Sequence, residues 1–176
     1  MKDVTDADFW IDHLGLTEHP EGGYFKEIYR SSETIQKNAL PKEYENDRAF
    51  CTSIYFLLKE KQTSAFHRLR SDEIWHFYKG SSLTIYIIEK NRNLKIIKLG
   101  NNPLNGEVLQ FVIEKNQWFG AEVNDKNSYS LIGCTVSPGF DFHDFELGNT
   151  ENLLKEPARL RHILQMIIQE STILQI

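Results

Sequence analysis

The stretch from His67 to Gly80, HRLRSDEIWHFYKG, places histidine and glutamate side chains between two apolar runs. His67 is followed by Glu73 and His76, and the flanking runs are CTSIYFLL and SSLTIYIIE. A histidine takes up and releases protons near neutral pH, and a neighbouring carboxylate stabilises its charged form. This stretch is therefore the first candidate for proton-transfer chemistry, and its apolar flanks predict that the side chains point into a pocket.

Alternation along the strands predicted here separates these side chains by face, because successive side chains of a strand point to opposite sides. His67 and Leu69 share one face of the strand predicted at residues 64–69. Glu73 and Trp75 share one face of the next strand, whereas His76 points to the other face unless a β-bulge shifts the register. The alternation therefore separates His76 from Glu73 and Trp75.

The chain as a whole predicts an all-β domain with helices only at its ends. Short apolar runs separated by turn residues indicate about nine strands without strand–helix alternation, as in a β-sandwich or barrel. We predict a short helix that ends at Gly15 and a long surface loop, a lid or a subunit contact, at residues 31–49. A single domain would span 1–176, with a barrel at about 22–147 and C-terminal helices at about 150–170. The predicted strands are 24–29, 50–58, 64–69, 73–78, 83–89, 94–99, 108–113, 118–123 and 128–136.

Composition excludes several classes of protein. The 176 residues carry a formal net charge of −5 without a basic block, which argues against nucleic acid as a partner. No apolar run is long enough for a membrane-spanning helix, and the N-terminus lacks a signal-peptide core, so we expect a cytoplasmic protein with no membrane partner. Cys51 and Cys134 lie in apolar runs and are expected to be buried thiols.

The spacing around His67 resembles the first motif of the cupin superfamily, in which His-x-His is followed by a glutamate and then a glycine. His67 stands first, Leu69 takes the place of the second histidine, and Glu73 and Gly80 follow at matching distances. The second cupin motif, Pro-x-Gly-x-x-His, has lost its signature residues here; the aligned positions hold Glu114, Asn116 and Phe119.

Three longer segments narrow this resemblance. HPEGGYFKE (19–27), SDEIWHFYKG (71–80) and VSPGFDFHDFELG (136–148) are similar to signatures of the cupin-5 family, domain of unknown function 985. The resemblance implies a double-stranded β-helix, the jelly-roll cupin barrel shared with sugar epimerases of the rhamnose pathway. It also implies a homodimer and a small-molecule pocket inside one end of the barrel, but no particular reaction. Because the motif histidine and glutamate of cupins face the barrel interior, the resemblance and the alternation together place His67, Glu73 and Trp75 inside.

A first hypothesis is metal-independent proton transfer, similar to that of the sugar epimerases, on a polar metabolite such as a sugar derivative. His67 would be the base and Glu73 its partner, and Tyr24 or Tyr86 would return a proton. An anionic group of the substrate would be held by a nearby cation, for which the candidates are Lys26, Arg30, Arg68 and Arg70.

A second hypothesis is a divalent metal site, as in cupin dioxygenases and metal-dependent isomerases. Cupin metals usually take three histidines and a glutamate, and of these only His67 and Glu73 remain. No cofactor is therefore expected, and a metal would have to recruit His76, His143 or Asp141.

A third hypothesis is small-molecule binding without catalysis. Aromatic side chains predicted to face the interior would line the cavity, with Asp141 at its rim. His19, in HPEGG, is expected to shape a turn rather than to bind a ligand. The sequence leaves open whether the chain is an enzyme. The aromatic candidates for the pocket are Trp75, Trp118, Phe119 and Phe140.

Overall fold

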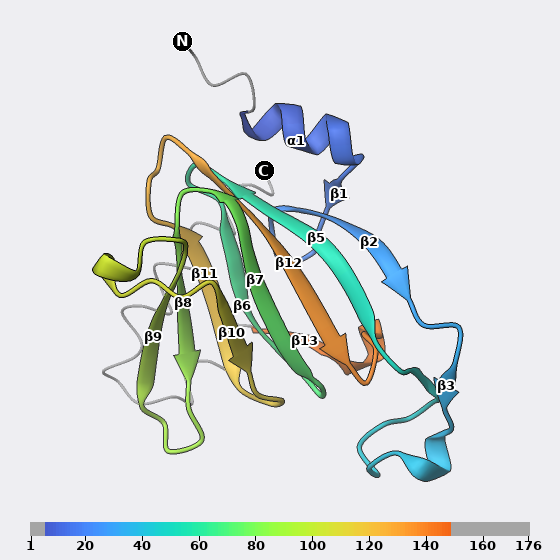
Figure 1. Cartoon of the computed structure of the whole chain (residues 1–176). Coiled ribbons are helices and arrows are strands. Elements are labelled where there is room, and N and C mark those ends of the chain that lie inside the picture. The colour runs from blue at the N-terminus through green and yellow to red at the C-terminus, as the bar shows by residue number, and fades with distance from the viewer. Residues whose placement is uncertain (1–5, 149–176) are drawn as a thin grey trace.

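The computed structural model describes residues 6–148, which form two larger antiparallel sheets, a short helix and a small hairpin (Figure 1). The six-stranded sheet has the order β1-β2-β5-β12-β7-β10, and the five-stranded sheet has the order β13-β6-β11-β8-β9. The elements are α1 Ala7–Leu14, β1 Thr17–Glu18, β2 Tyr24–Arg30, β3 Thr34–Ile35, η1 Lys37–Ala39, β4 Arg48–Ala49, β5 Thr52–Lys59, β6 Thr63–Leu69, β7 Asp72–Gly80, β8 Leu83–Ile88, β9 Leu94–Leu99, η2 Pro103–Asn105, β10 Gln110–Ile113, β11 Trp118–Val123, β12 Tyr129–Ser137, η3 Phe142–Asp144 and β13 Phe145–Leu147.

The predicted all-β fold is confirmed, and the alternation along β7 is the clearest case. Glu73, Trp75 and Phe77 are buried, whereas Tyr78 is half exposed. The buried side chains of β7 face those of β8 and β11 across the space between the sheets, and Phe119 of β11 contacts Trp75 edge to face. Burial of each large apolar side chain contributes about 1.5–3 kcal/mol, so this core holds the two sheets together.

Helix α1 covers the outer face of the six-stranded sheet (Figure 1). The side chain of Asp6 accepts a hydrogen bond from the backbone N–H of Phe9, and the helix ends at Gly15, as predicted, in the left-handed conformation that glycine tolerates. The indole N–H of Trp10 donates to the hydroxyl of Tyr129 at 2.9 Å. The second core cluster beneath the helix contains Leu16, Leu57, Tyr129 and Leu131.

Residues 31–49 are more ordered than the predicted surface loop. Thr34 and Ile35 pair with Ala49 and Arg48 in the β3–β4 hairpin. The guanidinium of Arg48 is buried and donates to both carboxylate oxygens of Asp144, at 2.6 and 2.8 Å. This pair fastens the hairpin to η3, so the prediction of a plain surface loop is wrong for this part of the segment.

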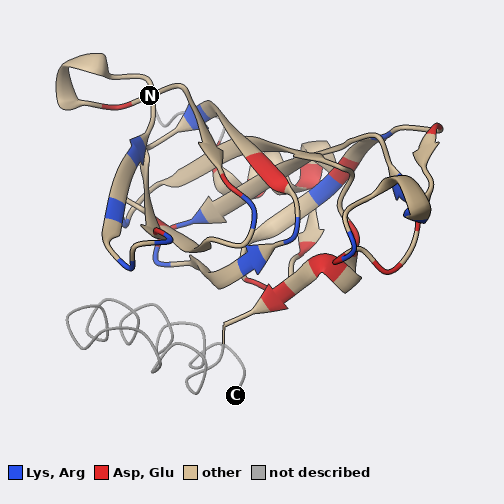
Figure 2. Cartoon of the chain, turned by 90° about the horizontal axis from the view of Figure 1, so that it is seen from below, with Lys and Arg blue, Asp and Glu red and all other residues tan. Residues whose placement is uncertain are grey.

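Figure 2 shows positions of Lys and Arg and of Asp and Glu interspersed along the strands and loops of the described ribbon. Within residues 6–148, no helix combines the length and the apolar character needed to cross a membrane. The C-terminal helices predicted at about 150–170 lie outside the described residues.

Candidate functional site

A cavity of about 360 Å³ lies at one end of the space between the sheets. This volume is within the range of roughly 300–1,000 Å³ that is typical of small-molecule sites. Its walls come from β2, β5, β6, β7 and β12, and from the segment that carries η3 and the start of β13. The residues that line it are His19, Glu21, Phe25, Glu27, Arg30, Thr52, Ile54, Phe56, His67, Leu69, Glu73, Cys134, Val136, Phe140, Asp141, Phe142, His143 and Phe145.

His67 is held in one tautomer by its own strand. Its Nδ1 lies 2.8 Å from the carbonyl oxygen of Ala65, and a carbonyl only accepts, so Nδ1 carries the proton. In the neutral ring Nε2 is then unprotonated. Burial lowers the pKa of His67, with Glu73 acting in the opposite direction, so the neutral ring is favoured. The ring of Phe119 covers His67 with 4.0 Å between ring centroids.

Glu21 enters the same cavity because the HPEGG segment makes a tight turn against β5 and β6. The backbone N–H of Ala65 donates to the carbonyl of Glu21 at 2.8 Å. Gly22 has a φ of 104°, and a Cβ there would overlap the carbonyl oxygen of Thr63. Only glycine allows this close approach, which turns the preceding glutamate inward.

The carboxyl of Glu21 lies between two imidazoles. Its Oε1 accepts from the hydroxyl of Ser64 at 2.8 Å, and its Oε2 lies 3.3 Å from Nε2 of His67 and 3.4 Å from Nδ1 of His19. The backbone N–H of Glu21 donates to that same Nδ1, so the neutral His19 carries its proton on Nε2. Burial raises the pKa of Glu21 and lowers the pKa of His19, and both shifts favour uncharged forms.

Glu73 is the second buried carboxyl of the cavity. Burial raises its pKa to about 7, against the effect of His67 and together with that of Glu21. Within residues 6–148, Oε2 of Glu73 has no hydrogen-bond partner. A buried carboxyl oxygen without a partner is costly, so this atom is suited to a ligand that supplies one.

The mouth of the cavity combines aromatic rings with paired charges. Arg30 donates to both carboxylate oxygens of Glu27, at 3.0 and 2.6 Å, and to the carbonyl of Phe140 at 3.1 Å. Asp141 caps η3 through the backbone N–H of His143 and lies 2.6 Å from Nδ1 of the same histidine. The hydrogen bond from the backbone N–H of His143, and to a smaller extent Arg48, lower the pKa of Asp141, so the rim favours charged groups while the interior favours neutral ones.

The structure brings four of the predicted site residues to the cavity: His67, Glu73, Phe140 and Asp141. Trp75 and Phe119 lie in the core behind its wall, where they contact each other. The sequence prediction missed the acidic residue between the two imidazoles, Glu21, and gave His19 only a role in a turn. The HPEGG motif was the signal, because two adjacent glycines permit close backbone contacts at that point.

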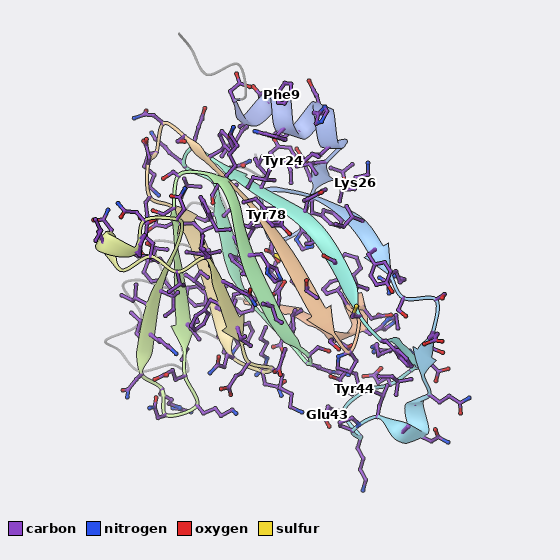
Figure 3. All side chains as sticks on the ribbon, in the orientation of Figure 1. Phe9, Tyr24, Lys26, Glu43, Tyr44 and Tyr78 are labelled. Carbon is purple, nitrogen blue, oxygen red and sulfur yellow. The ribbon has the colours of Figure 1, made fainter. Side chains whose placement is uncertain are left out.

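The other predicted pocket residues do not line the cavity. Tyr24 and Lys26 lie beneath α1 on the outer side of the sheet (Figure 3), where Lys26 donates to the carbonyl of Leu14. His76 also faces outward, and its Nε2 lies 3.2 Å from the hydroxyl of Thr135. Tyr86 donates to Glu122 at 2.6 Å, and Trp118 packs under the guanidinium of Arg68.

The side chains that could bind a metal ion in this cavity do not match the ligands of a cupin metal centre. Leu69 and Phe119 occupy positions where a metal-binding cupin has histidines, and His76 points away from the cavity. The Nδ1 of His67 is committed to a backbone carbonyl. In residues 6–148, no three His, Cys, Asp or Glu side chains are grouped as metal ligands.

Two facing antiparallel sheets with a cavity at one end define a cupin jelly roll. The chain belongs to the family described as Cupin superfamily (DUF985), whose model matches residues 8–148. This result confirms the family resemblance seen in the sequence motifs.

Similar proteins support the same assignment. Protein SO0799 from Shewanella oneidensis is 39% identical, with a TM-score of 0.83 over 93% of this chain and 98% of that one. A hypothetical protein from Leishmania major is 32% identical, with a TM-score of 0.79 over 94% of this chain and 98% of that one. The uncharacterized protein YML079W of Saccharomyces cerevisiae is 29% identical over 163 residues, 88% of this chain and 78% of that one.

A more distant likeness shows the fold alone. Oxalate decarboxylase from Bacillus subtilis is 14% identical, with a TM-score of 0.53 over 85% of this chain and 34% of that one. At this identity the shared barrel carries no information about the reaction, so the function is argued from the site.

Proposed function

We propose that this chain binds a small molecule inside the barrel and transfers protons on it, with His67 as the base and Glu73 as the acid. The observation that supports this most directly is the hydrogen bond from Nδ1 of His67 to the carbonyl of Ala65. It leaves Nε2 as the nitrogen with a lone pair, in a ring that borders the cavity. A neutral imidazole of this kind is a suitable general base near neutral pH.

Glu73 supplies the complementary group. With a pKa of about 7 it still holds its proton at pH values just below 7 at which His67, whose pKa is lowered, is already neutral. A general acid works best when its pKa is close to the working pH. The two groups also act on each other, because Glu73 raises the pKa of His67 and His67 lowers that of Glu73. A proton taken up by one therefore favours release of a proton by the other.

The reaction class that these roles support is proton transfer next to a carbonyl. Nε2 of His67 would take the proton from the carbon, and the C–H electron pair would form a C=C bond. The carbonyl π electrons would move to oxygen, which would take the proton of Glu73. The products are an enol, an imidazolium and a carboxylate. Return of the proton to the neighbouring carbon completes an isomerisation, and its return to the opposite face of the same carbon completes an epimerisation.

Glu21 is a positioning residue in this scheme. Its Oε2 lies 3.3 Å from Nε2 of His67, and the hydroxyl of Ser64 holds its other oxygen. Because its Oε2 faces the same Nε2 that would act as the base, Glu21 would stabilise the imidazolium in its ionised form, which burial disfavours until that positive charge appears. The order His67, Glu21, His19 extends the proton-exchanging groups from the interior of the cavity toward its aromatic mouth, where His19 stacks on Phe142.

Deuterium exchange tests the proposal without knowledge of the natural ligand. The probes are dihydroxyacetone and 2-hydroxyacetophenone in D₂O, with the CH₂ signal next to the carbonyl followed by ¹H NMR. We expect the wild-type chain to accelerate exchange in at least one probe and His67→Asn to slow it by about 10²–10⁴-fold. Glu73→Gln should also slow it.

Binding is measured on the same variants by chemical-shift titration, with near-ultraviolet circular dichroism as the control for folding. Exchange that is no faster than in buffer, or that His67→Asn leaves unchanged, contradicts the catalytic part of the proposal. Probe binding without exchange would assign the cavity to ligand binding alone, the third hypothesis raised by the sequence.

The homodimer implied by the family stays a prediction. The edge strand β10 of the six-stranded sheet leaves Val112 half exposed, and Leu109 just before it is more exposed still. An uncovered edge with apolar side chains supports pairing with a second copy. Light scattering during size-exclusion chromatography gives the mass directly, and a mass near that of one chain, 20.6 kDa, would contradict it.

A further inference from the structure

The outer half of the cavity is an aromatic ring of side chains, which we call the phenylalanine collar: Phe25, Phe140, Phe142 and Phe145. Ring centroids of Phe140 and Phe142 lie 5.0 Å apart, and those of Phe142 and Phe145 lie 6.2 Å apart. The Phe142 side chain remains about half exposed, so one of its faces is available at the mouth. Flat apolar surfaces of this kind bind rings in offset or edge-to-face contacts.

The charges at the collar neutralise one another. Arg30 and Glu27 form a two-point ion pair, and a further guanidinium nitrogen of Arg30 is bonded to the backbone. Asp141 is engaged by His143. A charged ligand would have to separate one of these pairs, or ionise Glu73 or protonate His67 against the effect of burial, and both are unfavourable.

The remaining cations that the sequence suggested as anion-binding groups are also occupied. Lys26 donates to a carbonyl beneath α1, and Arg68 pairs with Glu146 at 2.6 Å. Arg70 donates to the backbone carbonyl of Glu43 and to the side chain of Glu45. For the part of the chain from residue 6 to 148, no ammonium or guanidinium group is left facing the cavity without a partner.

The floor of the cavity offers the opposite chemistry. Oε2 of Glu73 is buried and lacks a hydrogen-bond partner among the described residues. A group on the ligand that donates or accepts a hydrogen bond would satisfy it. The cavity therefore has an apolar aromatic entrance, a neutralised rim and one unsatisfied polar position at depth.

We propose that the cavity takes an uncharged molecule with a flat ring, which packs against the phenylalanine collar while a hydrogen-bonding group of the molecule reaches Glu73. This narrows the polar metabolite expected from the sequence to a neutral, ring-bearing compound. It rests on the proposed function only in that the cavity binds a small molecule, and it does not require proton transfer.

Four probes of similar size distinguish the effect of ligand charge on binding from the effect of a flat aromatic ring. They are benzamide, benzoate, benzylammonium and cyclohexanecarboxamide. Each is titrated into the full chain at pH 6.5, and binding is followed in ¹H–¹⁵N spectra. We expect benzamide to bind with shifts concentrated at Glu73 and Phe142, and both charged probes to bind at least about tenfold more weakly. The non-aromatic amide should bind about threefold to tenfold more weakly than benzamide.

A pair of phenylalanine variants tests the collar itself. Phe142 and Phe50 are 54% and 45% exposed, and only Phe142 lines the cavity. We expect Phe142→Ala to weaken benzamide binding by about threefold to tenfold, and Phe50→Ala to leave it unchanged. Glu27→Gln releases Arg30 and should strengthen the binding of benzoate.

The inference is overturned if no probe binds, if a charged probe binds as tightly as benzamide, or if the two phenylalanine variants behave alike. Unchanged benzoate affinity in Glu27→Gln would also contradict it. These titrations do not involve deuterium exchange. A chain that binds benzamide but exchanges no proton supports the ligand class and contradicts only the catalytic proposal.

Discussion

Arg48 and Asp144 are as deeply buried as Glu21, His67 and Glu73, yet the two groups of ionisable side chains are stabilised in opposite ways. Arg48 donates through two nitrogens to Asp144 and through a third to backbone carbonyls of the β3–β4 hairpin. In the cavity the carboxyls meet imidazoles whose pKa values are lowered, and burial favours the uncharged forms.

The comparison teaches that burial of charged residue types does not by itself mark a functional site. A buried ion pair with every donor and acceptor used is fixed in one protonation state and serves the architecture. A buried group with an unused polar atom and a pKa near 7, such as Glu73, can change its protonation state with little cost. The Arg48–Asp144 pair belongs to the first kind, and it holds the segment that borders the cavity.

The largest effect is expected when the Arg48–Asp144 ion pair is broken. Arg48→Met leaves the buried carboxylate of Asp144 without its bidentate donor, so we expect the free energy of unfolding to fall by about 3–5 kcal/mol. Urea unfolding measures it. The double variant Arg48→Met, Asp144→Leu should recover much of this loss, because no unpaired charge remains. A loss below about 1 kcal/mol in the single variant would show that the pair resembles a surface ion pair.

The second expected effect is slightly smaller and concerns how the stability contributed by Glu73 depends on pH. The pKa of Glu73 is raised from 4.5 to about 7 on folding. Between these values the unfolded chain has released a proton that the folded chain retains, so the stability contributed by Glu73 falls as the pH rises. The full difference is roughly 3 kcal/mol.

Glu73→Gln removes this dependence, because glutamine does not ionise. We expect the variant to gain stability relative to the wild-type chain between pH 5 and pH 8, by up to roughly 3 kcal/mol in urea unfolding. Glu114→Gln, at an exposed position, is the control and should differ from wild type by the same amount at both pH values. An equally constant difference for Glu73→Gln would contradict the raised pKa.

The same contrast explains what the sequence could predict. Strand alternation separates Glu73 and Trp75 from His76, and the family resemblance indicated which of the two faces is buried. Alternation depends on residues close together in the chain, and the structure agrees with the faces that it predicted for β7. Leu69 at a motif position predicts an incomplete set of metal ligands, and this stays a prediction.

The features that were missed depend on contacts distant in sequence. Glu21 reaches the site through Ser64, which is 43 residues away, and Arg48 reaches Asp144 across 96 residues. Tyr24 and Lys26 were assigned to the pocket, but their faces could be chosen only once β2 was seen beside β5 and beneath α1. A single sequence gives each strand two possible faces, and tertiary packing selects between them.

The smallest effect is expected for an ion pair on the surface. Lys90 and Glu114 form an ion pair with 3.1 Å between nitrogen and oxygen, but their side chains are 75% and 60% exposed. Water screens such a pair, and ordering two long side chains offsets much of the attraction. Lys90→Ala should therefore change the free energy of unfolding by no more than about 0.5 kcal/mol, with little dependence on salt. A loss that approached that of Arg48→Met would mean that ion pairs stabilise this chain regardless of burial. The distinction between the buried Arg48–Asp144 pair and the ionisable groups of the cavity would then have no support.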